Sequence, residues 1–325
     1  MEKNACLLGA AALAAAVLSA SPAMAGGFPD KPVTLIVPYP PGDGTDVVAR
    51  LIGAEIGQRL GQPIVIENKA GAGGQIGLGL TAKAAPDGYT LGVAQVSNMA
   101  LAPHTYKNLP YDPLKDFTPV AMVSSNYLAL ITRPDAPFKT VPEMIQWAKA
   151  HPNTLTLGTT GTAGLQHMSF AMLAQKAGDI TFMNVPYKGN STVIGDLVGG
   201  RIDLAFPSYT AAAPLIANGS VRLLGITNPV RDPKLKDLPT LGESVKDYGS
   251  VGWFGFVAPA GTPQAIVARL NGEINRAVRQ PRVQEAMSSM GLQPVTESPA
   301  FFGKLIETEN LKFARLVKDI GYEPQ

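Results

Sequence analysis

The sequence predicts an α/β fold in which two wound lobes hold a ligand in a cleft between them. Short apolar stretches alternate with helical patterns along the chain, as is typical of α/β proteins. Two glycine-rich turns, at residues 38–46 and 158–167, each follow an apolar strand and precede a helix. Such a turn directs unpaired backbone N–H groups and the positive end of a helix dipole at one point, so it can bind an anion without a cationic side chain. We expect one turn in each lobe, with the anion between them.

The first 25 residues have the pattern of a secretory signal peptide. Lys3 gives a short positive region, residues 7–18 are rich in alanine and leucine, and Ala-Met-Ala at residues 23–25 is a cleavage motif. The apolar run is short for a membrane span, and we expect cleavage before Gly26. Cys6 is the only cysteine and lies in the segment that would be removed. The exported chain is therefore expected to have no disulfide, zinc-thiolate site or cysteine nucleophile.

Composition limits the class of partner. The 325 residues are 46% hydrophobic and 16% charged, which is typical of a globular protein with enough core for one large or two ordinary domains. The formal net charge of +2 is nearly balanced, and no block of like charges occurs. This balance argues against a nucleic-acid or anionic-membrane partner.

The first lobe is expected to begin with a strand–helix–strand–helix–strand unit. Its strands are expected at residues 33–37, 63–67 and 89–93, with helices at residues 46–60 and from residue 77 toward residue 84. In the first helix, apolar residues recur every four positions from Val48 to Leu60 and form one buried stripe. Thr45 or Asp46 is the expected N-cap, and Gly61 is expected to end the helix.

A second unit with a similar order of elements is expected after residue 125. Residues 103–119 are rich in proline and aspartate and are expected to form a surface loop. Beyond it, strands are expected at residues 120–123, 128–132, 155–157, 180–185, 202–206 and 221–226, and helices at residues 141–149, 165–177 and 191–198. A strand at residues 253–257 and helices at residues 263–278 and 301–320 would return the chain to the first lobe. The predicted lobes are residues 26–125 with 250–325, and residues 126–249.

Nucleotide-binding and hydrolytic sites are not supported by the motifs. Residues 71–77 approach a dinucleotide fingerprint, but Ile76 occupies the position of its third glycine. The chain lacks a Gly-Lys-Ser/Thr phosphate loop and a Gly-x-Ser-x-Gly nucleophile elbow. Its three histidines, His104, His151 and His167, have no metal-ligand spacing. We therefore expect no cofactor, no metal and no enzymatic activity.

Several polar residues follow predicted strands and are candidates for the cleft. Ser97 and Asn98 come after the third strand, where carboxyl ends of strands form binding crevices. Tyr187 follows a proline turn, and lining the cleft and simple packing are equally compatible with that place. His167 lies near the start of the helix after the second turn, where it can contact ligand or, more commonly, pack locally. Asp203 is flanked by apolar residues and must find polar partners, either in the cleft or at the surface.

Six motifs occur in order along the exported chain, at residues 39–46 (beginning Tyr-Pro-Pro-Gly), 67–77 (beginning Glu-Asn-Lys-Ala-Gly-Ala-Gly-Gly), 86–91 (Pro-Asp-Gly-Tyr-Thr-Leu), 109–112 (Leu-Pro-Tyr-Asp), 185–189 (Val-Pro-Tyr-Lys-Gly) and 255–263 (beginning Gly-Phe). Together they resemble the solute receptors of tripartite tricarboxylate transporters, the Bug family. The resemblance implies a type II periplasmic binding protein fold that captures a small organic carboxylate in the periplasm, without catalysis or cofactor, and delivers it to membrane permease subunits. Presentation of the ligand to a membrane sensor kinase is the alternative. We expect a monomer, and the ligand stays open among the carboxylates that such receptors bind.

The resemblance also implies which residues contact the ligand. In the family, backbone amides of the two turns hold a ligand carboxylate. The implied contacts are Tyr39, Gly42, Asp43, Gly44 and Thr45 on one side, and Thr159, Gly161 and Thr162 on the other. Two positions depart from the family pattern: Asp43 stands where glycine is common, and Gln75, a further candidate contact, stands where asparagine is common. The Asp43 carboxylate either points outward as a solvated or capping group, which we favour, or accepts a hydrogen bond from a donor on the ligand.

Overall fold

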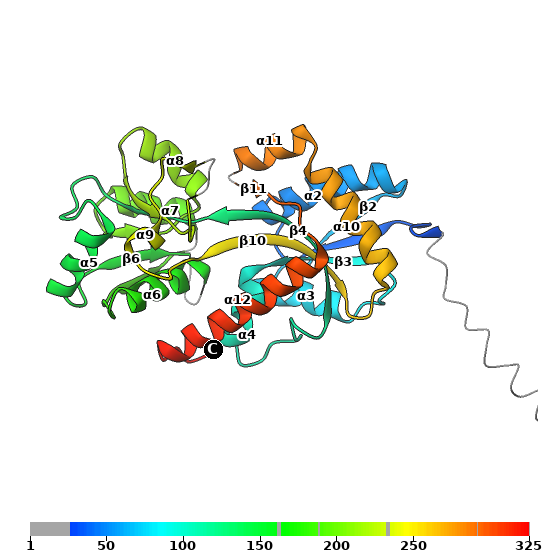
Figure 1. Cartoon of the computed structure of the whole chain (residues 1–325), viewed down its shortest axis with the longest axis horizontal. Coiled ribbons are helices and arrows are strands. Elements are labelled where there is room, and N and C mark those ends of the chain that lie inside the picture. Colours follow the sequence, from blue (N-terminus) through cyan, green and yellow to red (C-terminus); the bar gives the residue numbers. More distant parts are fainter. Residues whose placement is uncertain (1–26, 161–163, 188, 232–234, 291, 325) are drawn as a thin grey trace, which may run out of the picture.

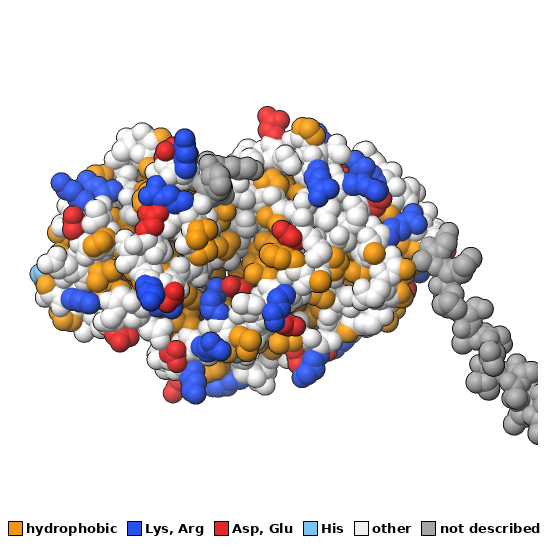
Figure 2. Space-filling view, viewed as in Figure 1, with side chains coloured by type: hydrophobic (Ala, Val, Ile, Leu, Met, Phe, Trp, Pro, Cys, Tyr) orange, Lys and Arg blue, Asp and Glu red, His pale blue; other side chains and the backbone are white. Residues whose placement is uncertain are grey.

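The computed structural model describes residues 27–160, 164–187, 189–231, 235–290 and 292–324. These residues form an elongated molecule of two bodies, each built around one β-sheet with helices against it (Figure 1). The two longest strands, β4 (Phe117–Tyr127) and β10 (Val251–Pro259), pair with each other and run from the first body toward the second. Acidic and basic side chains are interspersed over the visible face, without an extended patch of one sign (Figure 2).

The first sheet has six strands in the order β11-β4-β10-β3-β1-β2. β1 (Val33–Val37) pairs in parallel with β2 (Ile64–Asn68) and β3 (Thr90–Gln95). β10 is antiparallel to β3 and β4, and the short β11 (Gln293–Pro294) pairs with the other side of β4. The carboxyl ends of β1, β2 and β3 therefore lie at one edge of the sheet, where the first glycine-rich turn begins.

The helices of the first body are α2 (Gly44–Leu60), α3 (Gln75–Ala82), α4 (Ala102–Thr105), α10 (Gln264–Val278), α11 (Pro281–Ser289) and α12 (Pro299–Asp319), with the short turns η2 (Ala72–Gly74) and η3 (Ser97–Leu101). In α2 the predicted apolar stripe from Val48 to Leu60 is buried, which confirms it. The predicted N-cap was wrong. Asp43 caps this helix in place of Thr45 or Asp46, because the Asp43 side chain accepts a hydrogen bond from the Thr45 N–H.

The second sheet has five strands in the order β7-β6-β8-β5-β9. Its strands are β5 (Ala129–Thr132), β6 (Thr156–Thr159), β7 (Met183–Pro186), β8 (Leu204–Ala205) and β9 (Arg222–Ile226). Its helices are α5 (Val141–Ala150), α6 (Leu165–Lys176), α7 (Asn190–Val198), α8 (Tyr209–Ala217) and α9 (Leu241–Ser244). β6 is parallel to β7 and β8, so the second glycine-rich turn begins where the carboxyl ends of these strands meet.

The chain passes between the bodies at two adjacent points, near residue 128 after β4 and near residue 250 before β10. Leu128, between β4 and β5, exchanges hydrogen bonds with Thr227: its N–H donates to the Thr227 hydroxyl and its carbonyl accepts from the Thr227 N–H, both at 3.0 Å. The Ser250 N–H in turn donates to the Thr227 carbonyl at 3.0 Å. A hydrophobic core also continues across both bodies, with Phe302 of α12 and Phe170 of α6 as members. The two bodies are therefore joined by two chain crossings next to each other and by hydrophobic packing that includes α12.

The structure corrects several predicted elements. Residues 103–119 are not entirely loop, because α4 covers Ala102–Thr105 and β4 begins at Phe117. Besides α4, three helices were not predicted. Pro214 lies inside α8 and hid its helical pattern; α9 has only four residues; and in α11 only Val283 and Met287 are buried, which is too few to give a clear stripe. Asp203 precedes β8 instead of lying within it. None of the helices in the described ranges is long and apolar enough to span a membrane.

Candidate functional site

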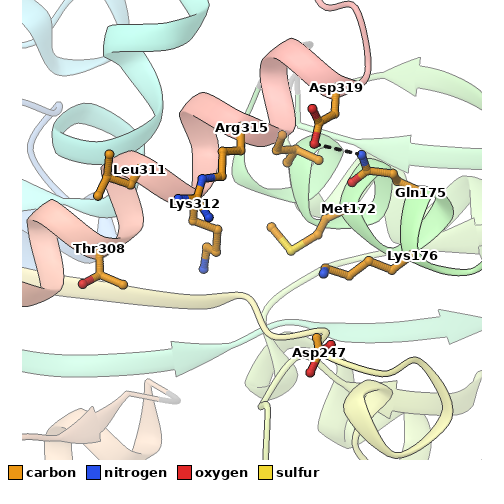
Figure 3. Close-up of a pocket in the computed structure, with 10 residues that line it drawn as sticks. Met172, Gln175, Lys176, Asp247, Thr308, Leu311, Lys312, Arg315 and Asp319 are labelled. Atoms are coloured by element: carbon orange, nitrogen blue, oxygen red, sulfur yellow. Dashed lines mark hydrogen bonds between the residues drawn. The ribbon is translucent and has the colours of Figure 1, made fainter.

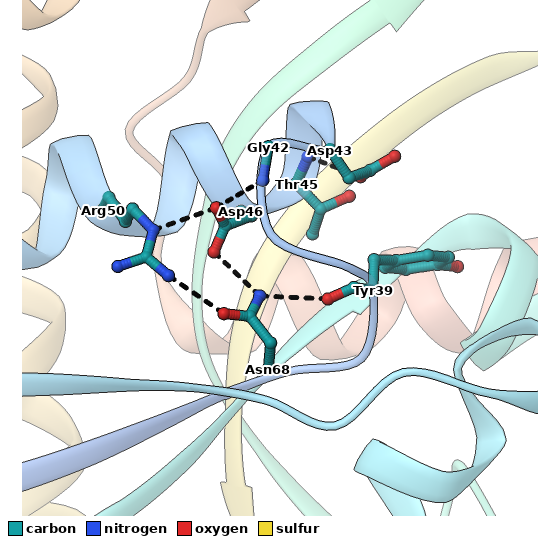
Figure 4. A network of polar contacts seen from close by, with 7 residues as sticks. All are labelled: Tyr39, Gly42, Asp43, Thr45, Asp46, Arg50 and Asn68. Atoms are coloured by element: carbon teal, nitrogen blue, oxygen red, sulfur yellow. Dashed lines mark hydrogen bonds and ion pairs between the residues drawn. The ribbon is translucent and has the colours of Figure 1, made fainter.

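The first glycine-rich turn is held in shape by the carboxylate of Asp46 (Figure 4). Asp46 Oδ2 accepts hydrogen bonds from the Gly42 N–H and from Arg50 Nε, both at 2.9 Å, and Asp46 Oδ1 accepts from Asn68 Nδ2 at 2.8 Å. Asn68 Nδ2 also donates to the Tyr39 carbonyl at 3.0 Å. Burial alone would raise the pKa of Asp46, but these hydrogen bonds outweigh it and lower the pKa to about 2. The Asp46 carboxylate therefore stays ionised and fixes the conformation of the turn through these hydrogen bonds.

These contacts change which amides of the first turn can meet a ligand. The Gly42 N–H is already used by Asp46, the Thr45 N–H donates to Asp43 Oδ1 at 2.9 Å, and the Asp43 N–H donates to the Pro40 carbonyl at 3.2 Å. Within the described part of the chain, the Gly44 N–H at the start of α2 has no partner. Among the predicted contacts at residues 42–45, the Gly44 amide is thus the one without a partner in the described residues, and the amides of Gly42, Asp43 and Thr45 already have partners.

A polar wall continues from this turn along the end of β3. Gln95, the last residue of β3, donates through Nε2 to the Thr45 hydroxyl, and its N–H donates to Asn98 Oδ1 at 2.8 Å. The Ser97 hydroxyl donates to Gln95 Oε1 at 3.4 Å. The structure thus brings the predicted residues Thr45, Ser97 and Asn98 together around Gln95. Gln95 was missed from the sequence, although its position at the carboxyl end of a central strand could have identified it.

Tyr39, Gly74 and Asn98 meet at the same wall. A Cβ atom on Gly74 would lie 3.2 Å from Asn98 Nδ2 and 3.3 Å from the Tyr39 hydroxyl, and Gly74 has a φ of +96°. The Tyr39 hydroxyl donates to the Gly73 carbonyl at 3.3 Å. Burial raises the pKa of Tyr39, and the nearby Asp43 carboxylate raises it further, whereas Ser97 and Asn98 lower it. Tyr39 is therefore a neutral hydroxyl at any physiological pH.

Two buried amide groups beside this wall lack hydrogen-bond partners. Asn98 is 0% exposed and Gln75 is 7% exposed, yet Asn98 Nδ2 and Gln75 Nε2 donate to no atom of the described residues. A buried donor without a partner costs about 1–3 kcal/mol. Both donors lie at the carboxyl edge of the first sheet, near the first glycine-rich turn.

The second turn begins at Thr159 in the other body. Its Oγ1 donates to Asn184 Oδ1 at 2.7 Å. The Thr160 N–H and hydroxyl both donate to Gln166 Oε1, at 2.7 and 2.9 Å, and Gln166 Nε2 donates to Asn190 Oδ1 at 2.9 Å. The start of α6 is therefore tied to the start of α7. The predicted contacts Gly161 and Thr162 lie outside the described residues.

Three other candidates are not brought into this site as ligand-facing groups. The backbone of Tyr187 adjoins Thr159, but its hydroxyl donates to Asp196 Oδ2 at 2.8 Å, beside Arg201. Asp203 lies at the amino-terminal ends of β6 and β8, the opposite end from the turn, where its Oδ2 accepts from the Thr156 N–H at 3.0 Å.

His167 packs edge-on against Phe182 in a cavity of about 580 Å³ that Tyr322 also lines, and burial lowers the pKa of His167. A neighbouring cavity of about 480 Å³ separates the C-terminal end of α6 from α12 (Figure 3). Gln175 Nε2 donates to Asp319 Oδ2 across it at 3.3 Å. This contact joins the two bodies at the end of α6 opposite the second turn.

Comparison with known proteins gives the same picture for the whole chain. Residues 48–322 match the family model described as the tripartite tricarboxylate transporter family receptor. Protein BugT of Bordetella pertussis is 33% identical over 304 residues, which are 93% of each chain. A solved R. palustris structure with adipate is 32% identical with a TM-score of 0.77, covering 92% of this chain and 100% of its own. MatC from Rhodopseudomonas palustris with bound malate is 33% identical with a TM-score of 0.73, covering 89% of this chain and 100% of its own.

Proposed function

Because this chain belongs to the tripartite tricarboxylate transporter receptor family, we propose that it captures a small organic carboxylate in the periplasm and passes it to the membrane permease of such a transporter. The family consists of periplasmic solute-binding receptors with the type II periplasmic binding fold, not of enzymes. The neighbours solved with adipate and malate support a carboxylate ligand. Export by cleavage of residues 1–25 is part of the proposal.

The observation that carries the proposal is the pair of buried, unpartnered donors, Asn98 Nδ2 and Gln75 Nε2, at the edge where the first turn begins. The available Gly44 N–H at the positive end of α2 adds a third donor on the same body. Three neutral donors suit an anionic oxygen, since hydrogen bonds to a charged acceptor are stronger than neutral ones. The opposite wall would be the second turn after Thr159.

We further propose that residues 26–125 with 250–325 and residues 126–249 act as two lobes that close on the ligand. The strand order supports this division, because every strand of the five-stranded sheet lies within residues 129–226. The hydrogen bonds of Leu128, Thr227 and Ser250, where the chain crosses between the bodies, support a hinge at this point.

Thermal unfolding of the exported protein with panels of mono-, di-, tri- and aromatic carboxylates tests the proposed function. A carboxylate at 100 times its dissociation constant should stabilise the native state by about 2.7 kcal/mol. An amine, sugar and neutral-amide panel at the same concentrations provides the comparison. Stabilisation by one of these neutral or cationic panels, and by no carboxylate, would overturn the proposal.

A further inference from the structure

We propose that this receptor selects a small carboxylate that also carries an ammonium or hydroxyl donor, and that Asp43 accepts the hydrogen bond from that donor. The inference rests on the proposed function and names the chemical class of its ligand. It starts from a residue that departs from the family pattern in the first turn.

The Asp43 side chain has a defined orientation. Asp43 has φ −63° and ψ 152°, the extended backbone of an N-cap, and its Oδ1 accepts the Thr45 N–H at 2.9 Å. Turning the carboxylate away would break this cap. Figure 4 shows the Asp43, Thr45 and Tyr39 side chains on one side of the turn, with Asp46 and Arg50 on the other. The predicted capping role is therefore present, and the exposed carboxylate lies beside Thr45, whose hydroxyl contacts Gln95 of the polar wall.

The charge of Asp43 is not neutralised by the protein around it. Asp46, on the far side of the turn, pairs with Arg50 at 2.9 Å. No ion pair of the described residues includes Asp43. The negative potential of Asp43 also reaches the Tyr39 hydroxyl, whose pKa it raises. A free carboxylate thus borders the same wall that holds the unpartnered donors.

In this proposal, the unpartnered donors recognise the carboxylate group of the ligand. Asn98 Nδ2, fully buried, faces the bare α-carbon of Gly74 beside the Tyr39 hydroxyl. These groups suit the carboxylate end of a ligand, while Asp43 suits a donor. A second ligand carboxylate near Asp43 would be repelled, and an ammonium group would be attracted. The wall therefore favours amino- and hydroxycarboxylates over plain polycarboxylates.

Titration of one matched set tests this selectivity. Succinate, L-malate and L-aspartate share a four-carbon dicarboxylate skeleton and differ in one group: hydrogen, hydroxyl or ammonium. We expect aspartate to bind the wild-type protein at least tenfold more tightly than succinate at pH 7 and low salt, with malate between them. Benzoate with 3-hydroxybenzoate and 3-aminobenzoate repeats the comparison on an aromatic skeleton.

Asp43→Asn is the informative variant because asparagine caps helices as well as aspartate does, so the charge is removed and the cap is kept. We expect the preference for aspartate over succinate to fall about tenfold, equivalent to 1.4 kcal/mol, with an unchanged melting temperature. Glu67→Gln is the matched control. It removes the charge of Glu67 on β2, which pairs with Lys69, and should leave the wild-type preference in place.

The outcomes separate this inference from the proposed function. Carboxylates that bind both proteins with the same ranking would overturn the role of Asp43 and leave carboxylate capture standing. An equal loss of preference in Glu67→Gln would show a general charge effect and would also overturn it. Failure of every acid to bind either protein would overturn the proposed function and this inference with it.

Discussion

Replacing Gln75 with methionine tests whether the unpartnered donors of the first body bind the ligand. Gln75 is 7% exposed and its Nε2 has no hydrogen-bond partner among the described residues. A buried amide in this state costs about 1–3 kcal/mol, and methionine has a similar length without a donor. We expect Gln75→Met to stabilise the ligand-free protein by about 1 kcal/mol, which raises Tm by about 2–4 °C for a chain of several hundred residues.

The same change should weaken binding. A hydrogen bond from an amide to a charged carboxylate contributes about 1.5–3 kcal/mol, so the affinity for a carboxylate identified by the thermal panels should fall about 10–100-fold. Calorimetric unfolding of the ligand-free protein and calorimetric titration measure the two effects separately. Greater stability with weaker binding is the signature of a donor kept unpaired for a ligand. Unchanged affinity in Gln75→Met would refute the assignment.

Thr240→Val is the matched control for this experiment. Thr240 is 2% exposed and its hydroxyl also lacks a partner within the described residues, but it lies next to α9 in the second body. Valine keeps the shape and removes the hydroxyl, and this side chain makes no capping hydrogen bond that would be lost. The variant should gain stability as Gln75→Met does and keep the wild-type affinity. A comparable loss of affinity in Thr240→Val would mean that stabilisation alone impairs binding.

Three further predictions concern the turns and the hinge. The pKa of Asp46 is lowered to about 2 in the folded protein, so its contribution, up to about 2.5 kcal/mol, is present above pH ~4 and lost between pH ~4 and 2; acid unfolding of Asp46→Asn should show a shallower pH dependence there, and an identical profile would contradict this. The family resemblance implies that the Gly161 backbone contacts the ligand carboxylate, so Gly161→Val should abolish carboxylate binding at nearly unchanged Tm; normal binding would make the second turn purely structural. Small-angle scattering should show a smaller radius of gyration with saturating ligand, and no change would count against closure.

The periodic part of the fold could be read from the sequence. The stripe from Val48 to Leu60 predicted α2 because burial at four-residue spacing depends on local order alone. The same method failed at α8, where Pro214 sits inside the helix, and at α11, which buries only Val283 and Met287. In these helices the packing of neighbouring elements, not the local pattern, decides the conformation.

The candidate site was predicted less completely, because its contacts join residues that are distant in the sequence. Ser97 and Asn98 were found from their place after a strand, yet Gln95, which links them to Thr45, was not. Asp203 was an ambiguous candidate from the sequence, and the structure places it at the opposite end of the second sheet. The carboxyl end of a strand can be identified only when the bounds of the strand are known. The expected strand at residues 202–206 included Asp203, but Asp203 precedes β8.

The two carboxylates of the first turn show why residue type alone does not give a function. Asp43 and Asp46 both lie at the positive end of α2, where any acidic residue is stabilised. Asp46 accepts hydrogen bonds from Arg50, Asn68 and the Gly42 N–H and is only 2% exposed, so groups of the protein itself neutralise its charge. Asp43 meets a single N–H, from Thr45, and remains exposed beside Tyr39. The protein thus neutralises the charge of Asp46 and leaves that of Asp43. A ligand bound beside Asp43 is therefore selected by the charge that the ligand itself carries. The turn motif, which relatives share, does not specify this selectivity.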